Sequence, residues 1–211
     1  MSGTVTRTYG SDQQAGTVVL QAAASGQSTV NLTLAKGTLA ETQSAATPYE
    51  GQCSQIGFDG VARDSAAHNC WRGTVWFLPQ ITLQAGVGWT DNIGSAVLAP
   101  DGTTDIHYSR SPAGTMSAGA AAVVARLSTF DLKIDAAGHP VSLKFNAHPD
   151  DNPEIDIPTQ IQFSDYRLVS GASVPFHIQK FINNGLVLDL QISNVQINPI
   201  LTTSASTAPL L

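Results

Sequence analysis

Apolar and polar residues alternate with a period of two along most of this chain, as in half-buried antiparallel strands. Near the N-terminus two such runs follow each other, with the positions Val18, Leu20 and Ala22 in the first and Ser28, Val30, Leu32 and Leu34 in the second. Gly26 between the runs predicts a hairpin turn. Gly37 ends the second strand, and Leu39 begins a short third strand.

The second half of the chain is nearly all strand. Its alternating apolar positions are Phe130, Leu132, Ile134, Val141, Leu143, Phe145, Ile155, Ile157, Ile161, Phe163, Val174, Phe176, Ile178, Leu186, Leu188, Leu190 and Ile192. The tripeptide Asn183-Asn184-Gly185 predicts a type I′ turn. Pro158 places its run at a sheet edge or a bulge. A change of parity near residues 193–194 predicts a β-bulge.

Two segments break this pattern and predict helices. Residues 117–128 form one, with Ser117 as the N-cap and a stripe of Ala120, Val123, Val124 and Leu127. Residues 71–86 are aromatic and apolar and predict a short helix that is broken at Pro79. Between these segments, Asp101-Gly102 predicts the turn of another hairpin.

These elements define a fold class. We expect a mainly β (α+β) fold with a single curved antiparallel β-sheet of about nine to eleven strands. Two helices cannot cover both faces of such a sheet, so we expect a half-barrel wrapped round its two helical segments. Residues 1–201 are predicted to form one domain, and residues 202–211 a flexible tail.

Composition and charge narrow the function. The 211 residues carry a net charge of −6 without a basic patch, which argues against a nucleic-acid partner. No apolar run approaches the ~18 residues of a transmembrane segment. Phosphate-binding glycine loops and the GxSxG motif of serine hydrolases are absent from the sequence. The remaining classes are binding proteins, structural modules and hydrolases of other kinds.

Cys53 and Cys70 are the two cysteines, and they lie in a turn-rich loop over residues 44–70 with one short strand near Ile56. A disulfide would hold such a loop together. Two free buried thiols, or a metal or catalytic site with His68, are the alternatives. An even cysteine count and few charged residues favour an extracytoplasmic protein, periplasmic or secreted. Residues 1–16 have no apolar segment, so no signal peptide is present in this chain.

The segment Ala147-His148-Pro149-Asp150-Asp151 resembles the signature of zinc-dependent deacetylases of the PIG-L/LmbE type. The resemblance implies that His148 and Asp151 bind zinc and that Asp150 acts as the general base. However, the motif follows an alternating strand and precedes Asn152-Pro153-Glu154, which disfavours the helix of that family. The alternative is a loop whose aspartates cap turns. We expect no catalytic residue and no bound metal or other cofactor.

The strands after Phe130 resemble the C-terminal strands of the LolA/LolB-like group. The features that carry the resemblance are Phe163-Ser164-Asp165-Tyr166-Arg167, Gly171, Val174-Pro175, Gly185 and the final Val195-Gln196-Ile197-Asn198. The resemblance implies an open sheet curled round a helical lid, in periplasmic or outer-membrane-associated proteins that hold lipoprotein acyl chains. It assigns no functional residue.

We therefore predict a non-enzymatic exported binding domain with an apolar or amphipathic ligand, such as a lipid or a lipoprotein acyl chain. The predicted ligand-binding residues, in a pocket between sheet and helices, are Trp71, Trp76, Phe77, Leu83, Trp89 and Val123. The same side chains could instead fill an ordinary core. The alternatives are a structural or partner-binding module of the cell envelope without a small ligand, and a zinc-dependent hydrolase at His148–Asp151.

Overall fold

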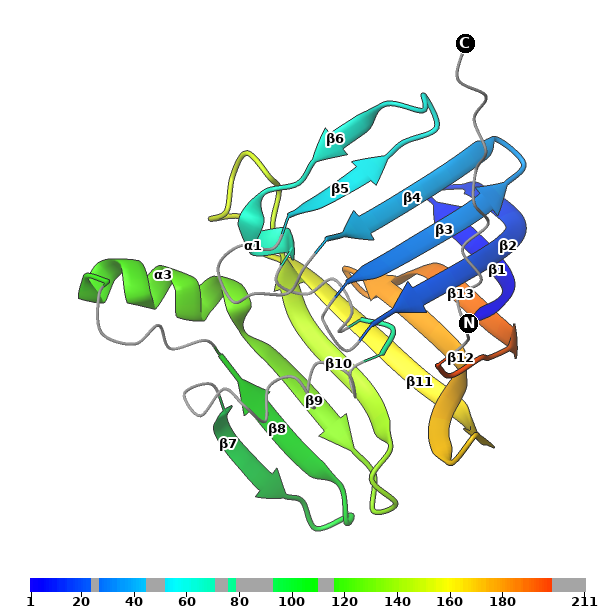
Figure 1. The fold of residues 1–211 in the computed structure, drawn as a ribbon. Helices are drawn as coiled ribbons and strands as arrows, with labels where there is room; N and C mark the ends of the chain where they lie inside the picture. Colours follow the sequence, from blue (N-terminus) through cyan, green and yellow to red (C-terminus); the bar gives the residue numbers. More distant parts are fainter. Residues whose placement is uncertain (24–26, 45–51, 71–75, 79–92, 110–115, 199–211) are drawn as a thin grey trace, which may run out of the picture.

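The structure, a computed structural model, describes residues 1–23, 27–44, 52–70, 76–78, 93–109 and 116–198. Within these residues the chain forms one antiparallel sheet of 13 strands and two helices. The sheet is open, because its edge strands β6 (Ala62–Asp64) and β7 (Ile93–Leu98) do not pair with each other. It curves as a half-barrel does (Figure 1). The mainly β fold is confirmed, but the predicted number of strands is too low.

Two meanders build the sheet. The first contains β1 (Ser2–Tyr9), β2 (Asp12–Ala22), β3 (Ser28–Leu34), β4 (Gly37–Gln43), β5 (Cys53–Ile56) and β6. The second contains β7, β8 (Thr104–Tyr108), β9 (Phe130–Ile134), β10 (Pro140–Ala147), β11 (Ile157–Val169), β12 (Ala172–Ile182) and β13 (Gly185–Asn194). The chain passes from β6 at one edge of the sheet to β7 at the other, and this connection includes residues 76–78.

Strand β1 joins the meanders in the middle of the sheet. It pairs with β2 on one side and β13 on the other, so that Val5 lies opposite both Gly16 and Leu190. The apolar pattern does not reveal this strand, because Val5 is its one buried residue and threonines surround it. Between β1 and β13 the register skips Ser193, which confirms the predicted bulge.

The turns agree with the sequence in most places. Asn183 and Asn184 both have positive φ angles, 50° and 64°, as the predicted type I′ turn requires. The prediction that Pro158 lies at a sheet edge or a bulge is wrong, because β11 is interior and its register with β10 is regular where Pro158 lies opposite Asn146. This residue is the second of the interior strand β11, and pairing with β12 starts only at Thr159. Its missing N–H is therefore not needed by β12.

The segment 44–70 contains more structure than the single predicted strand. Its described part forms a hairpin of β5 and β6, followed by the short helix α1 (Ala67–Cys70). Asp59 stabilises the turn, since its carboxylate accepts hydrogen bonds from the Val61 amide and the Arg63 guanidinium. The Arg63 side chain, together with the Val61 amide, lowers the pKa of Asp59 to about 2. An Asp59–Arg63 ion pair therefore lies in a β-hairpin, within a segment that the sequence predicted to be mostly loop.

The core lies on one face of the sheet, which we call the inner face. Its buried side chains are Val5, Val18, Leu20, Val30, Leu32, Leu34, Tyr108, Phe130, Leu132, Leu143, Ile161, Phe163, Val174, Phe176, Ile178, Leu190 and Ile192. Trp76 and Phe77 belong to the same cluster, with ring centroids 5.1 Å apart. Alternation within each strand therefore places one apolar row on the inner face, as the sequence predicts.

Helix α3 (Ala118–Ser128) forms where the sequence predicts it, and the Ser117 hydroxyl accepts a hydrogen bond from the Ala120 amide. Its predicted apolar stripe is mostly not buried: Val123 is 54% exposed and only Leu127 of the stripe is buried. The helix extends from the start of β9 and does not lie over the sheet (Figure 1). Arg126 fixes it there by donating to the carbonyls of Pro153 and Glu154 and to the Asp156 carboxylate. The expectation that this helix covers the inner face is wrong.

The predicted helix over residues 71–86 falls mainly outside the described residues. Of this segment the structure describes residues 76–78, where Trp76 and Phe77 form a turn. The predicted tail at 202–211 also lies outside the described residues.

Candidate ligand-binding site

The disulfide between Cys53 and Cys70 is confirmed, with a Sγ–Sγ distance of 2.04 Å. It joins the start of β5 to the end of α1, and Cys70 is buried. The alternatives of free thiols and of a thiolate metal site are therefore excluded. The bond keeps the segment that follows the edge strand β6 close to the sheet.

The His148–Asp151 segment supports this connection from the opposite side. The Asp150 carboxylate accepts hydrogen bonds from the Ala66 amide and the Asn69 side chain, at 2.9 and 2.7 Å. Asn69 also donates to the His148 carbonyl at 2.9 Å. These hydrogen bonds join residues that are 81 and 84 positions apart in the sequence. They attach α1 to the loop between β10 and β11.

The His148 side chain is buried, and its Nδ1 lies 3.0 Å from the Ile155 carbonyl oxygen. Among the described residues no group of three or more histidine, cysteine, aspartate or glutamate side chains could hold a metal ion. Asp150, the proposed general base, is occupied by structural hydrogen bonds. The structure therefore supports the loop interpretation of this motif and gives no support to zinc-dependent hydrolysis.

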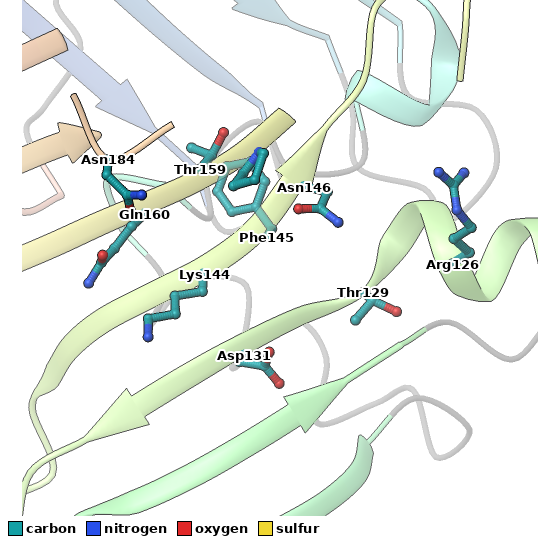
Figure 2. A pocket seen from close by; sticks show the side chains of 10 residues that line it. Arg126, Thr129, Asp131, Lys144, Phe145, Asn146, Thr159, Gln160 and Asn184 are labelled. Atoms are coloured by element: carbon teal, nitrogen blue, oxygen red, sulfur yellow. The ribbon is translucent and has the colours of Figure 1, made fainter. Parts of the chain in front are cut away.

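A polar hollow of about 430 Å³ opens beside β9, β10 and β11 (Figure 2). Its lining residues are Arg126, Thr129, Asp131, Lys144, Phe145, Asn146, Pro158, Thr159, Gln160 and Asn184. Figure 2 shows the labelled side chains spread from Asn184, across neighbouring strands, to Arg126 on helix α3.

A second hollow of about 470 Å³ lies on the inner face, and we call it the inner hollow. Its apolar lining residues are Val30, Leu32, Leu39, Ala40, Ile56, Ile182, Val187 and Leu188. Its other lining residues are Arg7, Thr8, Tyr9, Glu41, Gln55, Gly57, Arg63, Asp64, Ser65, Asp150 and Lys180. Residues of both meanders line it, so it depends on their junction at β1 and β13. Its size and mixed lining match the usual features of a small-ligand site.

The predicted ligand-binding residues lie elsewhere where the structure describes them. Trp76 and Phe77 are buried in the core, and Val123 is exposed on α3. None of these three is among the residues that line the inner hollow. Trp71, Leu83 and Trp89 lie outside the described residues.

Sequence reasoning missed Arg7 and Lys180, which line the inner hollow. For Lys180 a signal exists, because it follows the buried apolar residue Ile178 at a distance of two in an alternating strand. Arg7 has no such signal, because β1 shows no apolar alternation. A lysine at an apolar position of an alternating strand is expected to point to the inner face, because residues two positions apart in a strand share a face. The pairing that brings the two together was not visible in the pattern.

A hydrogen-bonded row of Ser164, His177 and Asp189 crosses β11, β12 and β13. The Ser164 hydroxyl lies 3.2 Å from His177 Nδ1, and His177 Nε2 lies 2.8 Å from an Asp189 carboxylate oxygen. This order reverses the two histidine nitrogens of the usual serine-protease triad. These three residues line neither hollow. We therefore interpret the row as cross-strand polar pairing.

No known protein family and no curated protein matches the sequence. Solved structures do match. A domain assigned to outer-membrane lipoprotein sorting from Vibrio parahaemolyticus superposes with a TM-score of 0.55 at 8% identity, covering 96% of this chain and 85% of that one. A DUF1329 family protein from Desulfovibrio piger gives 0.54 at 7% identity, with coverages of 95% and 85%.

These two similarities, each with a TM-score above 0.5, show the class of fold. A LolA superfamily protein from Nitrosomonas europaea also matches, with a TM-score of 0.42 at 9% identity over 92% of this chain and 86% of that one. The LolA/LolB-like resemblance read from the C-terminal strands is confirmed as a resemblance of fold. At identities this low, it transfers no residue and no activity to this chain.

Proposed function

We propose that this protein is a non-enzymatic carrier outside the cytoplasm that holds an acyl chain of a lipid or lipoprotein in the inner hollow. The observation that carries the proposal is the hollow itself, with apolar side chains from both meanders around about 470 Å³. Apolar side chains that line an open hollow contact water, and a ligand that covers them makes the free energy of binding more favourable. Carriage of an acyl chain uses this gain and needs no catalytic group.

Two further observations support this function. The structurally similar domain from Vibrio parahaemolyticus is assigned to lipoprotein sorting. The disulfide is typical of proteins that fold in an oxidising compartment such as the periplasm.

In the described part of the chain, no helix has the length and apolar character needed to cross a membrane. A protein partner in the cell envelope, to deliver or receive the ligand, belongs to the same proposal.

Titration with a fluorescent long-chain fatty acid tests the proposal. Leu39 lines the inner hollow and is half-buried, so Leu39→Trp should fill part of the hollow and weaken binding. Leu168 is 77% exposed and does not line the hollow, so Leu168→Trp is the matched control. We expect saturable binding by the wild type and by Leu168→Trp, and at least tenfold weaker binding by a folded Leu39→Trp variant.

Two results would overturn the proposal. The first is no saturable binding of any acyl probe by the wild type, which would favour a structural or partner-binding module. The second is equal binding by both tryptophan variants, with unchanged circular dichroism, which would place the ligand outside the inner hollow.

A further inference from the structure

Two cations interrupt the apolar rows of the inner face. Arg7 follows Val5 in β1, and Lys180 follows Ile178 in β12, each at the next position of the same face. Both cationic side chains line the inner hollow, and both residues are half-buried. A charged group in such a position loses part of its hydration, so its retention there needs a compensating interaction.

The strand register brings the two cations together. Leu188 of β13 lies opposite Arg7 of β1 on one side and opposite Lys180 of β12 on the other. Residues paired across neighbouring strands point to the same face. Two strand spacings separate the backbones of Arg7 and Lys180 by about 10 Å. Their long side chains can therefore converge on one small group above Leu188.

Aromatic rings hold the cations without neutralising them. The Arg7 guanidinium carbon lies 5.5 Å from the Tyr9 ring centroid and 5.7 Å from that of Phe58. The Lys180 ammonium lies 4.9 Å from a ring centroid of Trp76. Cation–π contacts orient a positive charge and leave it able to bind an anion.

Carboxylates pair with most other cations that the structure describes. The pairs are Lys36–Asp12, Arg63–Asp59, Arg126–Asp156, Lys133–Asp105 and Arg167–Asp165. Within the described residues, no carboxylate lies within 4.0 Å of the charged nitrogens of Arg7 or Lys180. Asp12 interacts electrostatically with Arg7 from a longer distance, and its carboxylate is paired with Lys36. The two cations therefore place positive charge without a direct ion pair on one wall of the hollow.

The carboxylates of the hollow belong to other elements. Glu41 lies in β4 and Asp64 in β6, whereas Arg7 and Lys180 flank β13. Asp150 accepts hydrogen bonds from Ala66 and Asn69, as described above. Arg63 of β6 also lines the hollow, and its guanidinium pairs with Asp59. Glu41 and Asp64 thus lie toward the β6 edge of the sheet, and Arg7 and Lys180 lie at the junction of the meanders.

We propose that Arg7 and Lys180 form a subsite for the phosphate or carboxylate group of an amphiphile whose acyl chain occupies the inner hollow. This subsite rests on the proposed function, because it assigns the headgroup end of the same ligand. An anion there would accept charge-assisted hydrogen bonds from both side chains in a partly dehydrated site. Leu188 and Ile182, beside the cations, would contact the first carbons of the acyl chain.

Calorimetric titration with decyl phosphate, decanol and inorganic phosphate tests the subsite. We expect the wild type to bind decyl phosphate at least about tenfold more tightly than decanol, because hydrogen bonds to charged groups contribute at that scale. The double variant Arg7→Gln/Lys180→Gln should lose this preference and keep its affinity for decanol. Lys144→Gln, which removes an exposed cation of the polar hollow, is the matched control and should behave as wild type.

The other outcomes separate the two proposals. Equal affinities of the wild type for decyl phosphate and decanol would overturn the subsite and leave the carrier function standing. Binding of neither decyl compound would overturn both. Inorganic phosphate that binds as tightly as decyl phosphate would overturn the headgroup assignment in favour of a free anion. If the double variant does not fold, the single variants Arg7→Gln and Lys180→Gln should each reduce the preference for decyl phosphate.

Discussion

At the scale of single residues, Asp150 shows how a local motif can mislead. Its five-residue context resembles a zinc site, but its carboxylate binds the Ala66 amide and the Asn69 side chain. These partners lie more than 80 positions away, so no local pattern could identify them. The chemistry of an aspartate was predictable from the sequence, whereas its partner was not.

We predict that Asp150→Ala lowers the free energy of unfolding by about 1–3 kcal/mol, because two donors lose a shared acceptor. Urea denaturation measures this change. Asp151 is exposed and serves as the control, so Asp151→Ala should stay within about 0.5 kcal/mol of the wild type. Stoichiometric zinc in the purified protein, lost in His148→Ala, would contradict the structural role and restore the hydrolase hypothesis.

Arg7 and Lys180 show a second limit at the same scale. Lys180 can be recognised from the sequence as a charge at an apolar position of an alternating strand, whereas Arg7 cannot, because β1 lacks apolar alternation. Their proximity cannot be recognised, because it depends on the pairing of β1 with β13. This pairing places Arg7 opposite Leu188, which lies near the other end of the chain. The candidate site could therefore be anticipated only in part.

At the scale of elements, the C-terminal hairpins were predictable, and β1 was not. Strands β12 and β13 combine clear alternation with a type I′ turn at Asn183 and Asn184, so local preference and burial agree. Strand β1 has one buried apolar residue, Val5, and takes its place from hydrogen bonds on both sides. Helix α3 was predicted from its cap, but its position follows from the contacts of Arg126 with distant carbonyls.

The disulfide supports a prediction at this scale. Replacing both Cys53 and Cys70 by serine should lower the free energy of unfolding by about 3 kcal/mol, since the bond closes a loop over a sequence separation of 17. Thermal unfolding of the variant and of the reduced wild type should give the same lowered midpoint. Two titratable thiols in the denatured, unreduced wild type would contradict the bond.

At the scale of the whole molecule, the junction of two meanders creates the inner hollow. Solved structures with 7–8% identity share this fold, which indicates that the sheet architecture tolerates nearly complete replacement of its side chains. In this chain the hollow is lined by apolar residues on its walls and by two cations beside Leu188. The fold class could be predicted from alternation alone, because burial requires one apolar face. The hollow could not, because it forms between strands that are distant in the sequence.

Photoaffinity labelling tests the central claim most directly. A fatty acid with a diazirine near its terminal methyl group is bound to the purified protein, irradiated and located by mass spectrometry of peptides. The acyl-carrier account predicts labels on the strands that line the inner hollow, at Leu32 of β3, Leu39 of β4 or Leu188 of β13, and their loss on competition with unlabelled fatty acid. Labelling confined to exposed apolar residues such as Val97 and Leu98 of β7, or unaffected by competition, would contradict it.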